Sequence, residues 1–350
     1  MSVPPSPRFL VIGSGAIGTY IGGSLALAGY PVTFLERPAI AQQIAGSGLK
    51  LEIAGETHAI TQPQVFGSLE SALAQANYDI AIFALKSYDT AGFLENISLQ
   101  QQAHFPTILC LSNGIGNEPA IAAVLGEHKV IAGTVTSAIG RRGPGEIVLE
   151  KLRGIGVAAG HPLSNPLAQA LQSAGLNAQL FPRPADMKWS KILTNLIGNA
   201  SAAILDMDTA AVYAHGGLYR LELRQLRETL AVMRAQGIRV VDLPGTPVRL
   251  LAFAVQYLPA TFSQRLLKKA VGGGRGGKMP SFHIDLHSGR GKSEVDYLNG
   301  AVVRAGARYR VPTPVNRALT DILTDLTNQE IPIRHYQQQP EKLLHAIQSS

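Results

Sequence analysis

A lysine and two asparagines occupy every fourth position of one largely apolar segment, residues 189–199. If this segment is a single helix, Lys191, Asn195 and Asn199 stack along one face with a drift of about 40° per step. Because the neighbouring residues are apolar, these groups are expected to lie beside the core and to need hydrogen-bonding partners. An ammonium and two amides suit a ligand with a carbonyl and hydroxyl groups, and an exposed helix face is the alternative interpretation. Lys188 lies off this face, and we expect its loss to be mild.

A glycine-rich loop near the start of the chain has the G-x-G-x-x-G spacing that binds dinucleotide phosphates. It follows an apolar strand expected over residues 9–12 and opens a helix expected over 19–28. The first glycine then permits a tight turn, the second lets a pyrophosphate approach the backbone, and the third allows close packing of helix and strand. The positive end of the helix dipole faces the same point. The predicted phosphate-binding residues are Gly13, Ser14, Gly15, Ala16, Ile17 and Gly18.

The next predicted strand, residues 32–37, ends in two side chains that favour different dinucleotides. Glu36 is the kind of residue that accepts a hydrogen bond from the ribose 2′-hydroxyl of NAD. Arg37 is the kind that pairs with the 2′-phosphate of NADP. These two residues alone leave both cofactors open.

A third polar group lies between residues 279 and 297. Ser281, expected in a loop, is a candidate to bind a carboxylate, and Glu294, expected at a helix start, is a candidate to bind a cofactor ribose. Helix capping by Ser293 is the alternative interpretation at the second position.

Two further patterns suggest ligands but are interpreted otherwise. His283 and His287 are four residues apart, yet no third metal ligand is evident, so we interpret them as surface or loop histidines and predict no metal. Residues 272–278 nearly match a phosphate-binding Walker loop, but Met279 replaces the hydroxyl residue that would hold magnesium. We interpret that segment as a glycine hinge or lid.

The elements that must position these groups change character along the chain. The first half alternates helical patterns with strands expected over 9–12, 32–37, 49–53, 58–60, 78–86, 107–111, 130–139 and 154–159. This alternation predicts a mostly parallel sheet covered on both faces. Ligands of such sheets bind at the carboxyl ends of the strands, where Lys86, Asn113 and the pair Ser137–Ala138 fall.

From about residue 181 the strand patterns stop. Helices are expected over 186–205, 209–236, 247–257, 294–305 and 315–329. The predicted fold is therefore α/β, with a Rossmann-type dinucleotide-binding domain at residues 1–182 and an all-helical substrate domain at 183–350.

Composition restricts the partners and the compartment. The chain has 350 residues and a formal charge of +7, but the 31 lysines and arginines form no run of five or more, which argues against nucleic acid and favours small anionic ligands. Its single cysteine, Cys110, excludes an internal disulfide framework and indicates a reducing cytoplasm. The uncharged residues 9–31 contain six glycines, which argues against a membrane span.

Taken together, these motifs resemble the ketopantoate reductase family across nearly the whole chain. The residues that carry the resemblance are Gly13–Gly18, Arg37, Lys86, Asn113, Lys191, Asn195, Asn199, Ser281 and Glu294. It implies a Rossmann domain joined to a helical domain, NADPH as cofactor, and reduction of the 2-oxo acid 2-dehydropantoate to pantoate on the route to pantothenate and coenzyme A. Because the family places an arginine at position 37 and the net charge is basic, we predict NADP(H) rather than NAD.

The resemblance also implies roles for single residues. Lys191 would polarise the substrate carbonyl and donate a proton, and Asn195, Asn199 and Ser281 would bind substrate. Asn113 would contact both cofactor and substrate. Lys86, Ala138 and Glu294 would contact the cofactor.

Two departures from the family pattern leave other functions open. Thr209 stands where many members carry asparagine, and one residue appears inserted between Asp285 and Glu294. The alternatives are a reductase of another 2-oxo acid and a dinucleotide-binding sensor without catalysis, although a sensor has no need for Lys191, Asn195 and Asn199. A homodimer is kept as a hypothesis for the assembly.

Overall fold

The computed structural model describes residues 6–260, 262–264 and 279–348, and the glycine-rich residues 272–278 lie outside these ranges. The chain divides into two compact units. The first comprises residues 1–112, 116–188 and 243–246, and the second comprises 113–115, 189–242 and 247–350. The division falls between Lys188 and Trp189, a few residues after the predicted boundary at 182/183.

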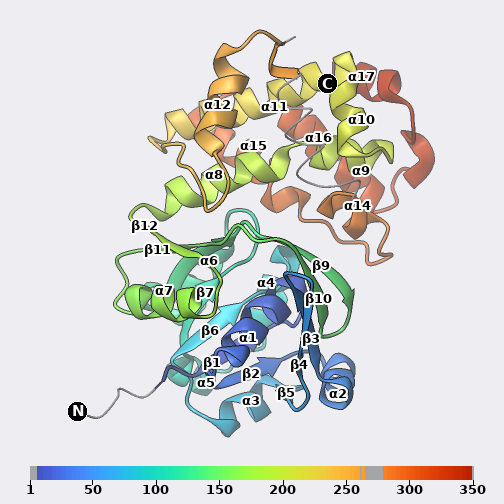
Figure 1. Cartoon of the computed structure of the whole chain (residues 1–350). Helices are drawn as coiled ribbons and strands as arrows, with labels where there is room; N and C mark the ends of the chain where they lie inside the picture. Colours follow the sequence, from blue (N-terminus) through green and yellow to red (C-terminus); the bar gives the residue numbers. More distant parts are fainter. Residues whose placement is uncertain (1–5, 261, 265–278, 349–350) are drawn as a thin grey trace. The chain divides into compact units, whose positions relative to one another are not determined.

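One sheet runs through the first unit. Its strands are β1 (Phe9–Ile12), β2 (Val32–Leu35), β5 (Gln64–Phe66), β6 (Ile80–Phe83), β7 (Thr107–Cys110), β8 (Val130–Val135), β11 (Ile155–Ala158) and β12 (Ala178–Phe181). They lie in the order β12-β11-β8-β7-β6-β1-β2-β5, and Figure 1 labels all of them except β8. Every neighbouring pair is parallel except β11 with β8. The predicted parallel sheet is confirmed.

Both faces of this sheet are buried because successive side chains of a strand point in opposite directions. Phe9 and Val11 join the core on the face covered by α1 (Ala16–Leu27) and α7 (Ser164–Ser173). Leu10, Ile12 and Cys110 join the core on the opposite face. The helices of that opposite face are α3 (Leu69–Gln75), α4 (Thr90–Glu95) and α6 (Asn117–Leu125). The remaining helices of the unit are α2 (Pro38–Ser47) and α5 (Leu99–His104).

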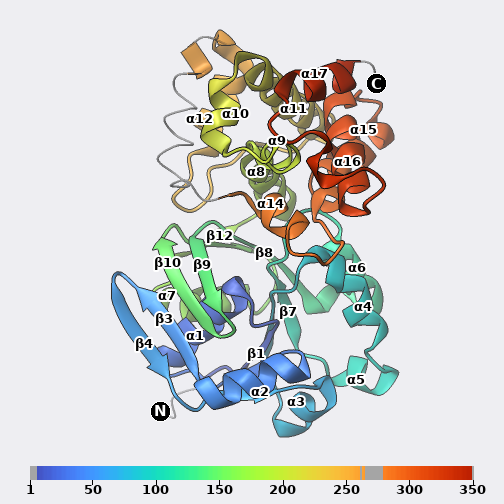
Figure 2. The ribbon, with the colours of Figure 1, turned by 90° about the vertical axis from the view of Figure 1, so that its right-hand side faces the viewer.

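A second sheet packs beside α1, as Figure 2 shows. Its strands are β3 (Leu49–Ile53), β4 (Glu56–Ile60), β9 (Ala138–Gly143) and β10 (Glu146–Lys151), in the order β4-β3-β10-β9. The prediction of one strand over 130–139 is therefore wrong. The chain turns at Ser137, whose hydroxyl accepts hydrogen bonds from the backbone amides of Arg153 and Gly154, both 3.0 Å away, and Ala138 starts a strand of the other sheet.

The second unit is built from helices, as predicted. They are α8 (Pro184–Leu196), whose first residues belong to the first unit, α9 (Asn199–Leu205), α10 (Thr209–Ala214), α11 (Gly216–Ala235), α12 (Val248–Tyr257), α14 (Ser281–Leu286), α15 (Asn299–Tyr309), α16 (Pro314–Thr327) and α17 (Pro340–Gln348). None of the described helices is both long enough and apolar enough to cross a bilayer.

Three buried amide side chains tie this unit together. Gln225 of α11 donates to the carbonyl of Leu196 at the end of α8, at 3.1 Å. Asn299 of α15 donates to the Gln225 side chain at 2.9 Å, and Asn316 of α16 donates to the Gln225 backbone carbonyl at 3.1 Å. All three residues are fully buried, so each amide group depends on the others for its partners.

Candidate functional site

Two of the loop glycines are required by the protein itself. Gly13 has a φ of 91°, and a Cβ there would lie 2.7 Å from a methyl group of Leu85. A Cβ on Gly18 would overlap the carbonyl oxygen of Gly13. Turn geometry and helix–strand packing therefore explain these two positions, as predicted for the first and third glycines.

Gly15 has no such internal reason to be glycine. Its φ is −71°, and a Cβ there would meet no described atom within 4 Å. It forms the N-cap of α1, where no side chain caps the helix and the first turn has no acidic residue. A group that approaches the backbone from outside accounts for a glycine here, and the uncapped positive helix end suits an anion.

Ser14 adds a second indication that this loop fits a phosphate. Its side chain is 1% exposed, and its hydroxyl has no hydrogen-bond partner among the described residues. A buried hydroxyl without a partner is costly, and a phosphate oxygen would satisfy it. The residues present in the loop therefore fit a dinucleotide phosphate.

Glu36 and Arg37 have different environments at the end of β2. The carboxylate of Glu36 accepts hydrogen bonds from the backbone amides of Ser14 at 2.8 Å and Arg37 at 2.9 Å, and the side chain is only 13% exposed. The Arg37 side chain is 71% exposed. The acid is thus engaged by the loop, while the guanidinium is the accessible group.

Lys86 and Ala138 come after β6 and β8, two strands of the main sheet that have β7 between them. Lys86 lies three residues after β6 and precedes a short 3₁₀ helix, Ser87–Asp89. Ala138 follows Ser137 directly and begins β9. Tyr20 of α1 hydrogen-bonds to Ser137, and burial raises the pKa of the Tyr20 hydroxyl above its usual value.

In the second unit, Asn113 and Asn195 lie together. The side-chain amide of Asn195 donates to the side-chain oxygen of Asn113 at 3.3 Å. The segment that carries Asn113 is anchored two residues later, where the amide of Ile115 donates to the carbonyl of Tyr297 at 3.0 Å. A Cβ on Gly114 would collide with the backbone of Tyr297, so glycine permits this close approach.

Asn199 and Ser281 form a second polar contact in the same unit. The Asn199 amide donates to the Ser281 hydroxyl at 3.2 Å, and its oxygen accepts from the backbone amide of Phe282 at 3.1 Å. Since Asn199 begins α9 and Ser281 begins α14, these bonds join the starts of two helices that pack together (Figure 2).

The expected arrangement of Lys191, Asn195 and Asn199 on one continuous helix is wrong. Lys191 and Asn195 share α8, but the helix ends at Leu196 and Gly198 adopts a left-handed φ of 57° before α9 begins. Asn199 still contacts the end of α8, because its side-chain amide donates to the backbone carbonyl of Asn195 at 3.1 Å. Four of the predicted residues, Asn113, Asn195, Asn199 and Ser281, still form contacts within this unit, through side-chain hydrogen bonds rather than through the spacing of one helix.

Glu222 is a residue of this region that the sequence did not single out. It is 1% exposed on α11, and its carboxylate accepts from the Gly198 amide at 2.8 Å and the Ser201 hydroxyl at 2.6 Å. These bonds hold the break between α8 and α9 and thereby position Asn199. The sequence signal that could have identified Glu222 is an acidic residue among the apolar positions of a helical pattern.

The environment of Lys188 also differs from the expectation that the loss of this residue is mild. It is 7% exposed, its ammonium lies 2.7 Å from the Glu118 carboxylate, and it donates to the carbonyl of Ser112 at 3.0 Å. Loss of this lysine would leave a partly buried carboxylate without its counter-ion, which is costly rather than mild.

Glu294 and Thr209 are both buried. Glu294 is 1% exposed and precedes a short 3₁₀ helix, Val295–Tyr297, so the predicted helix over 294–305 is interrupted before α15. Thr209 is 4% exposed and begins α10, and its hydroxyl has no hydrogen-bond partner among the described residues. Its methyl group packs against Gly198, next to Asn199.

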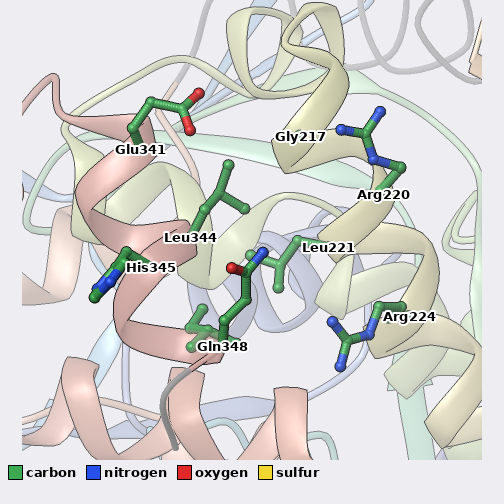
Figure 3. Close-up of a pocket in the computed structure, with 9 residues that line it drawn as sticks. Gly217, Arg220, Leu221, Arg224, Glu341, Leu344, His345 and Gln348 are labelled. Carbon is green, nitrogen blue, oxygen red and sulfur yellow. The ribbon is translucent and has the colours of Figure 1, made fainter.

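A hollow of about 560 Å³ lies between α11 and α17 and contains none of the predicted site residues. Figure 3 shows Arg220 and Arg224 on one wall, with Glu341 and His345 on the other. These four side chains are exposed, so the hollow is an open groove.

The doubly covered parallel sheet and the glycine loop at the start of α1 define a dinucleotide-binding protein of the Rossmann type, extended by a helical unit. Residues 9–160 match the family described as ketopantoate reductase PanE/ApbA, and residues 185–327 match its C-terminal part. The chain belongs to this ketopantoate reductase family.

Similar proteins cover nearly the full chain. A 2-dehydropantoate 2-reductase of Halobacterium salinarum is 29% identical over 329 residues, which span 90% of this chain and 97% of that protein. One from Lactococcus lactis is 26% identical over 90% of this chain and 96% of that protein.

Solved structures show the same fold. The PanE/ApbA family ketopantoate reductase of Ralstonia eutropha has a TM-score of 0.76 at 24% identity and covers 92% of this chain and 99% of its own. D-mandelate dehydrogenase in complex with NADH and anilino(oxo)acetate has a TM-score of 0.74 at 23% identity, with the same coverage of 92% and 99%.

Proposed function

We propose that this chain is an NADPH-dependent 2-dehydropantoate 2-reductase, in which the first unit binds the cofactor and the second binds the 2-oxo acid. The observation that carries the proposal is the polar cluster of the helical unit. Asn113, Asn195, Asn199 and Ser281 come from separate segments and are held by hydrogen bonds at 3.2–3.3 Å, with Lys191 one helical turn from Asn195. The relatives that share this chain's family and length carry the same activity in their names.

Binding of a dinucleotide to the first unit is supported by the glycine loop. The Ser14 hydroxyl and the backbone around Gly15 would hold the pyrophosphate, and Lys86 and Ala138 would contact the nucleotide. Arg37 would pair with a 2′-phosphate, since Glu36 is already engaged by backbone amides. Glu294 would contact the cofactor ribose, as the family resemblance implies. When bound, reduced nicotinamide supplies the hydride.

The residues of the second unit suit the rest of the reaction. A ketone that gains a hydride at carbon develops negative charge on oxygen, and the Lys191 ammonium stabilises that charge and transfers one proton to it. Asn195, Asn199 and Ser281 supply the hydrogen bonds that orient the carboxylate and hydroxyl of the substrate, and Asn113 contributes from its own segment.

A steady-state panel tests the proposal. NADPH oxidation is followed at saturating cofactor with ketopantoate, 2-oxoisovalerate and larger 2-oxo acids, including aromatic ones. We expect the highest kcat/KM for ketopantoate, because an amide left unpaired in a buried site penalises an analogue without the hydroxyl. If another acid gives the highest value, the pantothenate role is wrong while the reaction class stands. Sedimentation of the same sample tests the homodimer hypothesis.

One observation favours a second candidate, a reductase of a more apolar 2-oxo acid. Thr209 presents a methyl group where many members carry an asparagine, and its buried hydroxyl makes no described hydrogen bond. D-mandelate dehydrogenase, which shares the fold, binds NADH and a phenyl-bearing 2-oxo acid analogue. The aromatic acids of the panel, measured with both NADPH and NADH, decide between the two candidates.

A further inference from the structure

Asp206, His283 and His287 form a cluster in the helical unit apart from the proposed substrate residues. One ligand atom of each residue lies within 4.8 Å of the other two. Nε2 of His283 is 2.7 Å from a carboxylate oxygen of Asp206, and the two imidazole rings are 4.2 Å apart. The sequence showed only the two histidines, because Asp206 lies 77 residues before His283.

Local structure places these three groups together. His283 is on α14 and His287 follows its last residue, so their spacing of four puts both on one side of the helix. Asp206 ends α9 in a left-handed conformation with a φ of 50°, which aspartate tolerates better than most residues. Its second carboxylate oxygen accepts a hydrogen bond from the Gln337 amide at 2.8 Å. Such an outer partner orients a carboxylate that binds a metal.

The donor set suits one class of ligand. Two imidazoles and one carboxylate bind zinc and related divalent transition metals, and three protein ligands leave a position for water. In a tetrahedral zinc site the ligand atoms lie about 3.3 Å apart, since zinc to nitrogen or oxygen distances are about 2.0–2.2 Å. The present spacing of up to 4.8 Å closes by rotation of His287, whose side chain is exposed and therefore able to turn.

We propose that Asp206, His283 and His287 form a binding site for a divalent transition metal, with zinc as its simplest occupant. An ordinary ion pair accounts for His283 with Asp206, but not for the second imidazole, His287, whose ring lies beside that of His283. A bound metal would connect the end of α9 to α14, the helices that begin with Asn199 and Ser281. This consequence for substrate binding rests on the proposed function, whereas the metal site itself does not.

Direct binding measurements test the site without any substrate. The full chain is stripped with a chelator and titrated with Zn²⁺ by calorimetry, and with Co²⁺ by visible absorption. We expect one ion per chain and the absorption bands of a four-coordinate cobalt site. The melting temperature is expected to rise with zinc concentration, because the metal binds the folded state.

Variants identify the ligands. His287→Gln is the main variant because its side chain is exposed, and its fold is checked by circular dichroism. Zinc affinity is expected to fall by at least about 100-fold, since loss of an outer partner alone costs about 10- to 100-fold. His345→Gln, an exposed histidine of α17, is the matched control and should bind as the wild type. The proposal is overturned if the wild type binds no stoichiometric zinc, or if His287→Gln binds it equally well.

Discussion

The carboxylate of Glu222 accepts a hydrogen bond from the backbone amide of Gly198 at 2.8 Å, and this bond joins two segments 24 residues apart. Gly198 is the residue at which α8 gives way to α9, so a buried acid on α11 determines where Asn199 begins the next helix. The position of Asn199, a proposed substrate-binding residue, therefore depends on Glu222, which has no proposed contact with the substrate.

Glu222→Ala should lower both stability and substrate use. Two buried donors, the Gly198 amide and the Ser201 hydroxyl, would lose a charged acceptor, which costs about 1–3 kcal/mol each. We expect a lower melting temperature and a reduced kcat/KM for ketopantoate, with KM for NADPH nearly unchanged. Glu222→Gln keeps an acceptor and should recover much of the loss. Wild-type kcat/KM in the alanine variant would show that the turn forms without Glu222.

Lys191→Ala should lower kcat by about 10²–10⁴, the range expected for a positioned acid–base group. Cofactor affinity, measured by fluorescence titration with NADPH, should remain close to that of the wild type. Lys50→Ala, at an exposed position of β3, is the control. Turnover close to wild type in Lys191→Ala would remove this lysine from the mechanism.

Lys188→Ala should destabilise the fold rather than affect the chemical step selectively. The partner carboxylate of Glu118 is only 17% exposed, and leaving such a charge unpaired costs about 3 kcal/mol or more. Urea unfolding measures the difference. The double variant Lys188→Met with Glu118→Gln should recover part of it, whereas Arg304→Ala, which breaks an exposed pair with Asp296, should cost less than about 1 kcal/mol. Equal losses in Lys188→Ala and Arg304→Ala would contradict the role of burial.

Arg37→Ala should discriminate between the two nicotinamide cofactors. A charged hydrogen bond to a phosphate contributes about 1.5–3 kcal/mol, so KM for NADPH should rise about 10- to 100-fold while KM for NADH changes little. The KM values for NADPH and NADH are both measured by steady-state kinetics with the same 2-oxo acid. An equal rise in KM for both cofactors would show that Arg37 does not bind the 2′-phosphate.

The pH dependence of stability should carry a contribution from Glu228 of α11. Burial raises the pKa of its carboxyl, although hydrogen bonds from Asn316 and Val315 act in the opposite direction. The folded protein then holds this proton more tightly than the unfolded chain. Its contribution to the free energy of unfolding is therefore full below the unfolded pKa of about 4.3 and decreases as pH rises through the folded value.

Unfolding in urea between about pH 4 and pH 7, for the wild type and Glu228→Gln, isolates this contribution. The stability of the wild type relative to the variant should fall with rising pH. A difference that grows with pH would mean that the hydrogen bonds outweigh burial.

Local patterns predicted much of the fold. The apolar runs at residues 9–12, 80–83 and 107–110 are strands because both faces of the sheet are covered. The spacing of the glycine loop likewise reflects two backbone requirements, at Gly13 and Gly18. Nothing local marks the turn at Ser137, however. It depends on amides of Arg153 and Gly154, which lie on a later segment.

The same limit applies to the candidate sites. Helical spacing placed Lys191 and Asn195 on one helix, but Gly198 ends that helix through a bond to Glu222, far along the sequence. Asp206 reaches His283 in the same non-local way. Periodicity reports which face of a segment is apolar, and it does not report which distant group will satisfy a backbone amide.

The amides of Gln225, Asn299 and Asn316 have a consequence for how the helical unit is assembled. Leucine packing alone lets one helix shift along another by a turn and still find leucines to contact, whereas a buried amide finds its acceptor at a single position. A shift of α8 by one turn would leave the carbonyl of Leu196 without the donor that Gln225 now provides. These three side chains therefore select one axial position of α8, α11, α15 and α16 relative to one another. That choice also determines where Asn195 of α8 lies within the unit.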